Sequence, residues 1–232
     1  AEKLQQLTLP AKYLIGHYPV TNAEYALFVA NQGYDLDQPW WTEQGRFYIS
    51  LMKRNQPARW DYLNFNAPNQ PVVAITWHEA TAYCNWLTIC GHYDGWLANK
   101  AKIRLPTYAE WTRVARHTDK RRYPWASDAF DPEYANVEAT KIGCPTPIGC
   151  FPKGAAVCGA QDLLGNVWEW TATLWQNPFD CQPICDARQQ ETIIVGKSFL
   201  DGSKRLCCGI RTKYLPFNWY SYVGFRLSLS FT

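Results

Sequence analysis

Three helix-start signals of one kind are spaced through the first half of the chain. Each is a threonine followed three residues later by a glutamate, and they occupy residues 21–24, 76–79 and 107–110. The threonine hydroxyl and the glutamate carboxylate each accept a backbone N–H group that a helix leaves without a partner in its first turn. Gly33 and Gly91 stop the apolar pattern that follows the first two signals. We therefore expect three short helices in this half.

The remainder of the chain indicates short strands joined by long irregular segments. Proline and glycine interrupt nearly every stretch between residues 120 and 165. Apolar runs or alternating patterns predict strands at 167–170, 193–195 and 223–230. Because no linker or internal repeat is visible, we expect one domain over residues 1–232. Its predicted class is α+β, with a few helices around small antiparallel sheets and much irregular structure.

The charge and the cysteines of the chain limit its partners and its location. The 23 basic and 20 acidic residues leave a formal net charge of +3, and the densest basic run, residues 120–122, has the length of an ordinary solvated loop. We expect no nucleic-acid partner. No stretch approaches the roughly 20 apolar residues that span a bilayer, and residues 1–6 do not begin a signal peptide. Nine scattered cysteines do not form a secretory pattern, so the predicted location is the cytoplasm.

Several strings, in order, resemble the formylglycine-generating-enzyme family, also called sulfatase-modifying factors. They stand at residues 13–25, 70–77 (QPVVAITW), 103–111, 123–125 (YPW), 165–170 (GNVWEW) and 223–226 (VGFR). The resemblance covers nearly the whole chain and implies the family's variant of the C-type lectin fold. Within these strings, Arg104 and Arg226 stand beside apolar residues, so we expect both to be structural arginines that bind buried oxygen atoms.

The resemblance also implies where catalytic residues would lie. Family members that oxidise a substrate cysteine hold copper with two cysteines, five residues apart, after a Gly-Gly-Ser-aromatic string. The matching string is 196–199 (GKSF), and the two positions fall on Asp201 and Leu206, which carry no thiol. The four histidines are too scattered for the iron site of another branch. We expect no catalytic cofactor and no enzyme; the alternative is a formylglycine-generating-type or related oxidoreductase that acts on a cysteine substrate.

The segment that replaces this active site indicates a hypervariable surface. Lectin-fold proteins diversified by retroelements carry their variable region between the Gly-Gly-Ser-aromatic and Gly-Phe-Arg strings, which is residues 199–222 here. These retroelements copy the adenines of their template at random, and asparagine codons are their main targets. Randomising the first two bases of an asparagine codon never produces Lys or Trp, so Lys204, Lys213 and Trp219 are expected to be framework. The predicted ligand-binding residues are Phe199, Leu200, Asp201, Gly202, Ser203, Leu206, Tyr214, Leu215, Phe217, Asn218, Tyr220, Ser221 and Tyr222.

The chemistry of that segment suits a protein or peptide ligand. Tyrosine offers a large contact area at a low entropic cost, as in antibody paratopes. The alternative is that its aromatic residues are ordinary core of the last strands. We further expect the full protein to fuse this domain, as its C-terminal part, to an effector domain.

One more string predicts a structural calcium site. In the family, the positions that match Asp162, Gly165, Val167 and Glu169 hold calcium through side-chain and backbone oxygens, the ligands that this ion prefers. The alternative is a tight turn whose carboxylates accept backbone N–H groups. Calcium here would add rigidity rather than chemistry.

Overall fold

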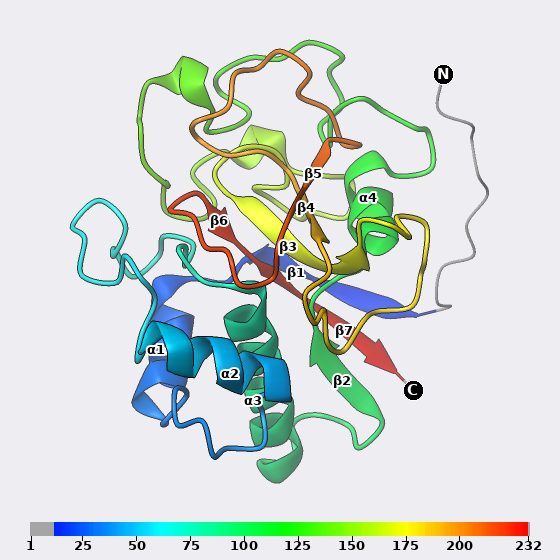
Figure 1. The fold of residues 1–232 in the computed structure, drawn as a ribbon. Coiled ribbons are helices and arrows are strands. Elements are labelled where there is room, and N and C mark those ends of the chain that lie inside the picture. The colour runs from blue at the N-terminus through cyan, green and yellow to red at the C-terminus, as the bar shows by residue number, and fades with distance from the viewer. Residues whose placement is uncertain (1–11, 232) are drawn as a thin grey trace.

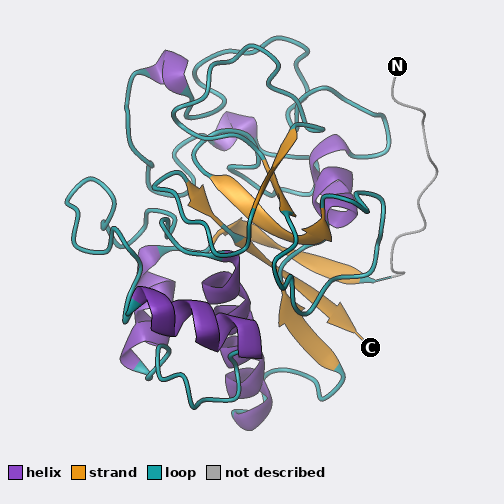
Figure 2. Ribbon diagram, in the orientation of Figure 1, coloured by secondary structure: helices purple, strands orange, loops and turns teal. Residues whose placement is uncertain are grey.

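The computed structural model describes residues 12–231, so the first eleven residues of the expected domain and Thr232 lie outside the described residues. Within residues 12–231, four α-helices and two short sheets are joined by long loops (Figures 1 and 2). The predicted α+β class is confirmed. The helices are α1 (Asn22–Ala30), α2 (Glu43–Met52), α3 (Trp77–Tyr93) and α4 (Tyr108–Arg116), with 3-10 turns at Glu138–Thr140 and Pro152–Gly154.

The three predicted helices begin where the sequence indicates. In α1, α3 and α4 the capping threonine accepts the N–H of the glutamate three residues on, and the glutamate accepts the N–H of the threonine. The sequence analysis missed α2. Its cap, Thr42, accepts the N–H of Gly45 at 3.1 Å, but glycine has no carboxylate to complete the reciprocal pair.

Two small sheets form the centre of the molecule. One has the order β1 (Tyr13–Pro19), β7 (Arg226–Phe231), β2 (Ala101–Arg104), and all its pairs are antiparallel. The other has the order β5 (Arg211–Tyr214), β4 (Thr192–Val195), β3 (Trp168–Leu174), β6 (Val223–Gly224), with β6 parallel to β3. The predicted strand 223–230 is therefore divided at Phe225, where the chain passes from one sheet to the other.

Two hydrophobic clusters fill the two sides of these sheets. The larger contains the aromatic faces of α1 and α3, which lie with α2 on one side in Figure 1. The smaller joins α4 to the irregular loops of residues 123–164 and to β4. The longest helix, α3, has 17 residues and includes polar ones, and none of the helices within residues 12–231 has the length and apolarity to cross a membrane.

A buried ion pair connects the two sheets. Arg226, on β7, is fully buried and donates to both carboxylate oxygens of Glu169, on β3, at 2.7 Å each. Its remaining N–H groups donate to the carbonyls of Gly16, His17 and Gln161. The predicted structural role of Arg226 is confirmed. The same holds for Arg104, which makes a bidentate pair with Glu110 at 2.6 and 2.7 Å.

We predict that Glu169→Gln lowers the free energy of unfolding by about 3–5 kcal/mol, because it leaves the Arg226 guanidinium buried without a counter-charge. Urea denaturation of purified protein measures the change. The matched control is Glu191→Gln, which removes a carboxylate from a half-exposed pair with Lys213 and should cost at most about 1 kcal/mol. Equal losses in the two variants would contradict the role given to the buried pair.

Candidate functional site

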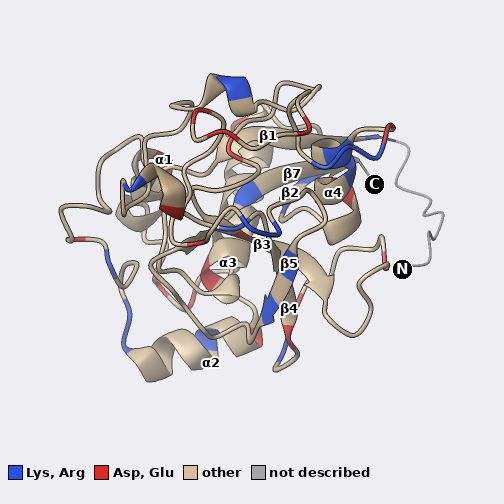
Figure 3. Ribbon diagram, turned by 90° about the horizontal axis from the view of Figure 1, so that it is seen from above, with Lys and Arg blue, Asp and Glu red and all other residues tan. Residues whose placement is uncertain are grey.

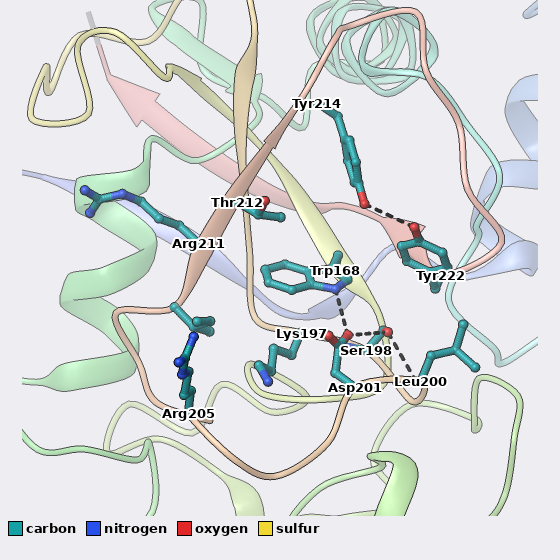
Figure 4. Close-up of a pocket in the computed structure, with 11 residues that line it drawn as sticks. Trp168, Lys197, Ser198, Leu200, Asp201, Arg205, Arg211, Thr212, Tyr214 and Tyr222 are labelled. Atoms are coloured by element: carbon teal, nitrogen blue, oxygen red, sulfur yellow. Dashed lines mark hydrogen bonds between the residues drawn. The ribbon is translucent and has the colours of Figure 1, made fainter.

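A pocket of about 560 Å³ opens between β5 and the loop that follows β4 (Figure 4). Ten of its eleven lining residues belong to residues 197–222, and the remaining one is Trp168 at the start of β3. The lining residues are Trp168, Lys197, Ser198, Leu200, Asp201, Arg205, Ile210, Arg211, Thr212, Tyr214 and Tyr222. Eight of the eleven belong to the segment 199–222 that the sequence analysis singled out.

The loop enters the pocket through a glycine that no other residue could replace without strain. Gly196 has φ +99°, and a Cβ there would lie 2.8 Å from the carbonyl oxygen of Leu163. Its own carbonyl accepts the N–H of Gly165 at 2.9 Å. The glycine of the 196–199 string is therefore required by the close approach of two backbones.

The floor of the pocket is held by hydrogen bonds. One oxygen of Asp201 accepts from the indole of Trp168 at 2.8 Å and from the N–H and hydroxyl of Ser198 at 2.9 and 2.7 Å. Lys197 donates to the carbonyls of Gly202 and Lys204, which closes the loop on itself. The predicted ligand-binding residue Asp201 therefore fixes the loop as well as lining the pocket.

Tyrosines form one wall of the pocket. The rings of Tyr214 and Tyr220 have centroids 4.4 Å apart, and those of Tyr220 and Tyr222 are 5.2 Å apart. The hydroxyls of Tyr214 and Tyr222 lie 3.1 Å from each other, as Figure 4 shows. Burial and the bond with Tyr222 raise the pKa of Tyr214 well above its ordinary value, so the Tyr214 hydroxyl keeps its proton at neutral pH.

The two arginines of the pocket differ in their surroundings. Arg211 lies against the rings of Tyr108, Trp175 and Phe179 and donates to the Tyr108 hydroxyl at 2.8 Å, so it belongs to the framework. Arg205 is exposed, and none of the carboxylates in the described part of the chain forms an ion pair with it. Arg205 is the cation of this pocket that remains open to a ligand.

Two of the predicted ligand-binding residues are core instead, and their prediction was wrong. Phe199 is 3% exposed and Leu206 is fully buried. Phe199 packs near Phe65, and Leu206 joins the cluster around Trp111, because the loop turns inward at each of these apolar side chains. The set of residues that a randomised codon can encode does not indicate which of them are buried, because burial depends on neighbours from distant parts of the chain.

The other predicted residues divide between two places. Leu200, Asp201, Tyr214 and Tyr222 line the pocket, while Gly202 and Ser203 are half-buried on the same loop. The second half of the segment turns away towards α2 and α3, where Phe217 stacks on Tyr48 at 4.8 Å. This second group consists of the half-buried Leu215, Phe217, Asn218 and Ser221. Tyr220 lies between the two groups, because its ring packs against those of Tyr214 and Tyr222 but does not line the pocket.

The residues present do not fit a copper site made of two thiolates. Asp201 and Leu206 occupy the two positions, Cys208 is buried with its sulfur 3.3 Å from the carbonyl of Ala115, and Cys207 is half-buried nearby. Within residues 12–231, no three His, Cys, Asp or Glu side chains are grouped so that they could hold a metal ion. All nine cysteines are unpaired.

Of the four predicted calcium ligands, Glu169 is engaged with other partners. Glu169 gives both carboxylate oxygens to Arg226 and also accepts the indole N–H of Trp111 at 2.8 Å. It therefore neutralises an arginine, and its prediction as a calcium ligand was wrong. Asp162 accepts the N–H of Gly149 at 3.1 Å, which is the capping role left open by the sequence, and Gly165 and Val167 are buried in the turn between them.

Comparison with known proteins decides the family. The family model of the sulfatase-modifying factor enzyme 1-like domain matches residues 2–230. The chain belongs to this family. Hercynine oxygenase of Mycolicibacterium thermoresistibile is 33% identical over 174 residues, which cover 69% of this chain and 35% of that protein. Formylglycine-generating enzyme of Thermomonospora curvata is 27% identical over 267 aligned positions, covering 92% of this chain and 80% of the enzyme.

A solved structure supports the same fold for this sulfatase-modifying-factor domain. The Treponema denticola variable protein 1 superposes with a TM-score of 0.63 at 21% identity, covering 93% of this chain and 84% of that one. The predicted C-type-lectin-like fold of the formylglycine-generating type is confirmed, and a variable protein shares it. The chain spans about a third of the length of the hercynine oxygenases it matches.

The relatives correct one prediction of the sequence analysis. The expectation that the chain is not an enzyme was wrong, because the relatives with 27% and 33% identity are named as enzymes. The inference failed because the loss of two thiol positions removes one kind of metal site and says nothing about other chemistry in the same fold.

We predict that stability depends on pH through Asp162. Burial raises the pKa of its carboxyl from 3.8 to about 6. Between these values the folded chain holds a proton that the unfolded chain has lost, so the free energy of unfolding should fall as pH rises from about 4 to 6, by at most about 3 kcal/mol. Asp162→Asn should remove this fall, and asparagine tolerates the φ of +54° found there.

Urea denaturation at several pH values between 4 and 7 measures the effect. Asp35→Asn is the control of opposite sign, because hydrogen bonds from Gln38 and the Asp37 N–H hold the pKa of the exposed Asp35 below its ordinary value. The contribution of Asp35 to the free energy of unfolding therefore grows as pH rises. If Asp162→Asn shows the same dependence of the free energy of unfolding on pH as the wild type, Asp162 is not its source.

Proposed function

We propose that this domain binds a protein or peptide ligand in the pocket beside β5, and that the exposed residues of the 199–222 segment set which ligand it takes. One observation carries the proposal: eight of the eleven residues that line the pocket come from this 199–222 segment. The pocket volume of about 560 Å³ falls within the usual range of roughly 300–1,000 Å³ for ligand sites.

The pocket offers both apolar and charged contacts to such a ligand. Leu200 is 54% exposed at its mouth, and Tyr214 and Tyr222 present aromatic faces and hydroxyls. Arg205 supplies a cation for an acidic side chain of the ligand. Because Asp201 and Lys197 already hold the loop, little ordering remains to be done on binding, which favours affinity.

Part of the loop shows a division of roles that supports diversification by a retroelement, whereas Asp201 both supports the loop and lines the pocket. Lys197 cannot arise from a randomised asparagine codon, and it makes the bonds that close the loop. Leu200 and Ser203 can arise from such codons, and their side chains are not part of that bonding. Exchange at these two positions would alter the surface while leaving its support in place.

We predict that Leu200→Ser changes the free energy of unfolding by less than about 0.5 kcal/mol, as expected for an exposed site. Phe199→Ser, the neighbouring buried position, should cost about 3 kcal/mol or more. Peptides selected by phage display against the wild-type domain should bind Leu200→Ser at least about tenfold more weakly.

The binding control is Phe47→Ser, which removes an exposed aromatic ring on α2 at a site outside the pocket. Selected peptides should bind this variant like the wild type. If all selected peptides ignore Leu200→Ser and respond to Phe47→Ser, the ligand site lies elsewhere.

A second candidate function is an oxygenase reaction in the same pocket, and the identity of 33% with a hercynine oxygenase favours it. The substrate would then be either a small molecule such as hercynine, or a cysteine residue within a peptide. Copper held by two thiolates plays no part in this candidate, because Asp201 and Leu206 occupy the matching positions.

An oxygen electrode tests the second candidate. We predict oxygen consumption above the rate of the metal salt alone when the domain receives hercynine, or a cysteine-containing peptide, with copper or iron salts. Tyr222→Phe, which removes one hydroxyl from the pocket wall, should lower that rate, and Phe47→Ser should not. A rate equal to the protein-free control with every substrate would eliminate this candidate for the chain on its own.

A further inference from the structure

A second pocket lies behind the turn of residues 205–210, on the side that faces α4. Its volume is about 510 Å³, and five of its ten lining residues are cationic. They come from the last turn of α4, from the loop that follows it and from the 205–210 turn: Arg116, Lys120, Arg121, Arg122 and Arg205, with the thiol of Cys207 between them. Basic segments gather around α4 and its following loop in Figure 3.

These cations are poorly neutralised. Among the described residues, one of the five cations forms an ion pair: Arg121 binds Asp119. The whole chain has a formal net charge of only +3, so the pocket concentrates charge that the remainder of the chain does not share. The carbonyl of Lys120 accepts from Arg116, and Arg122 lies over the ring of Tyr123, but these contacts leave the positive charges in place.

The walls of this pocket are fixed to one another. The N–H of Cys208 donates to the carbonyl of Arg122 at 2.8 Å, and its sulfur donates to the carbonyl of Ala115. Lys120 and Arg205 also have positive φ values of 59° and 61°, and His117, which ends α4, has φ 51° and ψ −149°. Such backbone conformations cost free energy in residues other than glycine, and they persist where the surrounding structure holds them.

The sequence analysis treated residues 120–122 as a solvated loop, but the fold brings Arg116 and Arg205 to the same hollow. We propose that this pocket binds a small molecule with linked phosphate groups. A tetrahedral phosphate directs oxygens to several sides and can accept from opposing walls at once, and guanidinium groups match phosphate oxygens two at a time. A single carboxylate would leave most of these donors unused.

The inference does not rest on the proposed function. Arg205 and Ile210 line both pockets, whereas Arg116 and Arg122 line only this one. A variant of Arg116 and Arg122 therefore tests the phosphate site alone. Cys207 supplies a second readout, because a ligand held among the cations would cover its half-buried thiol.

The experiment is calorimetric titration of the purified domain with inorganic tripolyphosphate, with ATP free of magnesium, and with citrate. Tripolyphosphate should bind at least about tenfold more tightly than citrate, and binding should weaken as salt is added. The double variant Arg116→Gln/Arg122→Gln should lose at least about tenfold in tripolyphosphate affinity. ATP binding more tightly than tripolyphosphate would identify a nucleotide, and equal affinity would identify the phosphates alone.

The matched control is Lys53→Gln/Arg188→Gln, which removes two exposed cations elsewhere on the surface. It should bind like the wild type. Tripolyphosphate should also slow the alkylation of Cys207 by iodoacetamide several-fold, measured by mass spectrometry, and leave the exposed Cys185 unaffected. This readout uses the wild-type protein, so it stands even if the double variant does not fold.

Three results would overturn the proposal. Equal losses in the two double variants would mean that only the overall charge attracts the anion. Citrate binding as tightly as tripolyphosphate would remove the phosphate assignment. Protection of Cys185 to the same degree as Cys207, or no protection of either, would place the anion outside this pocket.

Discussion

The bidentate pair between Arg226 and Glu169 is the contact on which this architecture depends. It joins β7 of one sheet to β3 of the other, and it uses every strong donor of a fully buried guanidinium. Trp111 of α4 adds its indole N–H to the same carboxylate. A buried charge without its partner is costly, so strand, strand and helix are held in one arrangement. The pair also occupies the carboxylate that the sequence had suggested for calcium.

The loop of residues 197–222 is held between two rigid points created by that arrangement. At one end, Gly196 passes against the backbone of Leu163, and at the other, Phe225 carries the chain from β6 to β7. Between them, Asp201 and Lys197 bind the loop to itself and to Trp168. Exposed positions such as Leu200 can therefore vary without loosening the scaffold, which is the physical condition for a diversified binding surface.

Two concave surfaces share the turn of residues 205–210, and their chemistry differs. The pocket beside β5 is lined by two tyrosines and a tryptophan together with residues of both charges, whereas the pocket beside α4 is lined by five cations and no carboxylate. Arg205 and Ile210 belong to both. One short turn thus separates a pocket of mixed aromatic and charged lining from one dominated by cations, and a ligand at either pocket would restrain the same backbone.

Local chemistry in the sequence was sufficient for the elements that depend on it. The caps at Thr21, Thr76 and Thr107, the family strings and the structural roles of Arg104 and Arg226 could all be predicted, because each needs only neighbouring residues or a recognisable pattern. Helix α2 escaped because Gly45 leaves its cap incomplete. The burial of Phe199 and Leu206, the partner of Glu169 and the meeting of Arg116 with Arg205 were decided by the tertiary structure. These features join residues far apart in the chain, and no local pattern carries the identity of a distant neighbour.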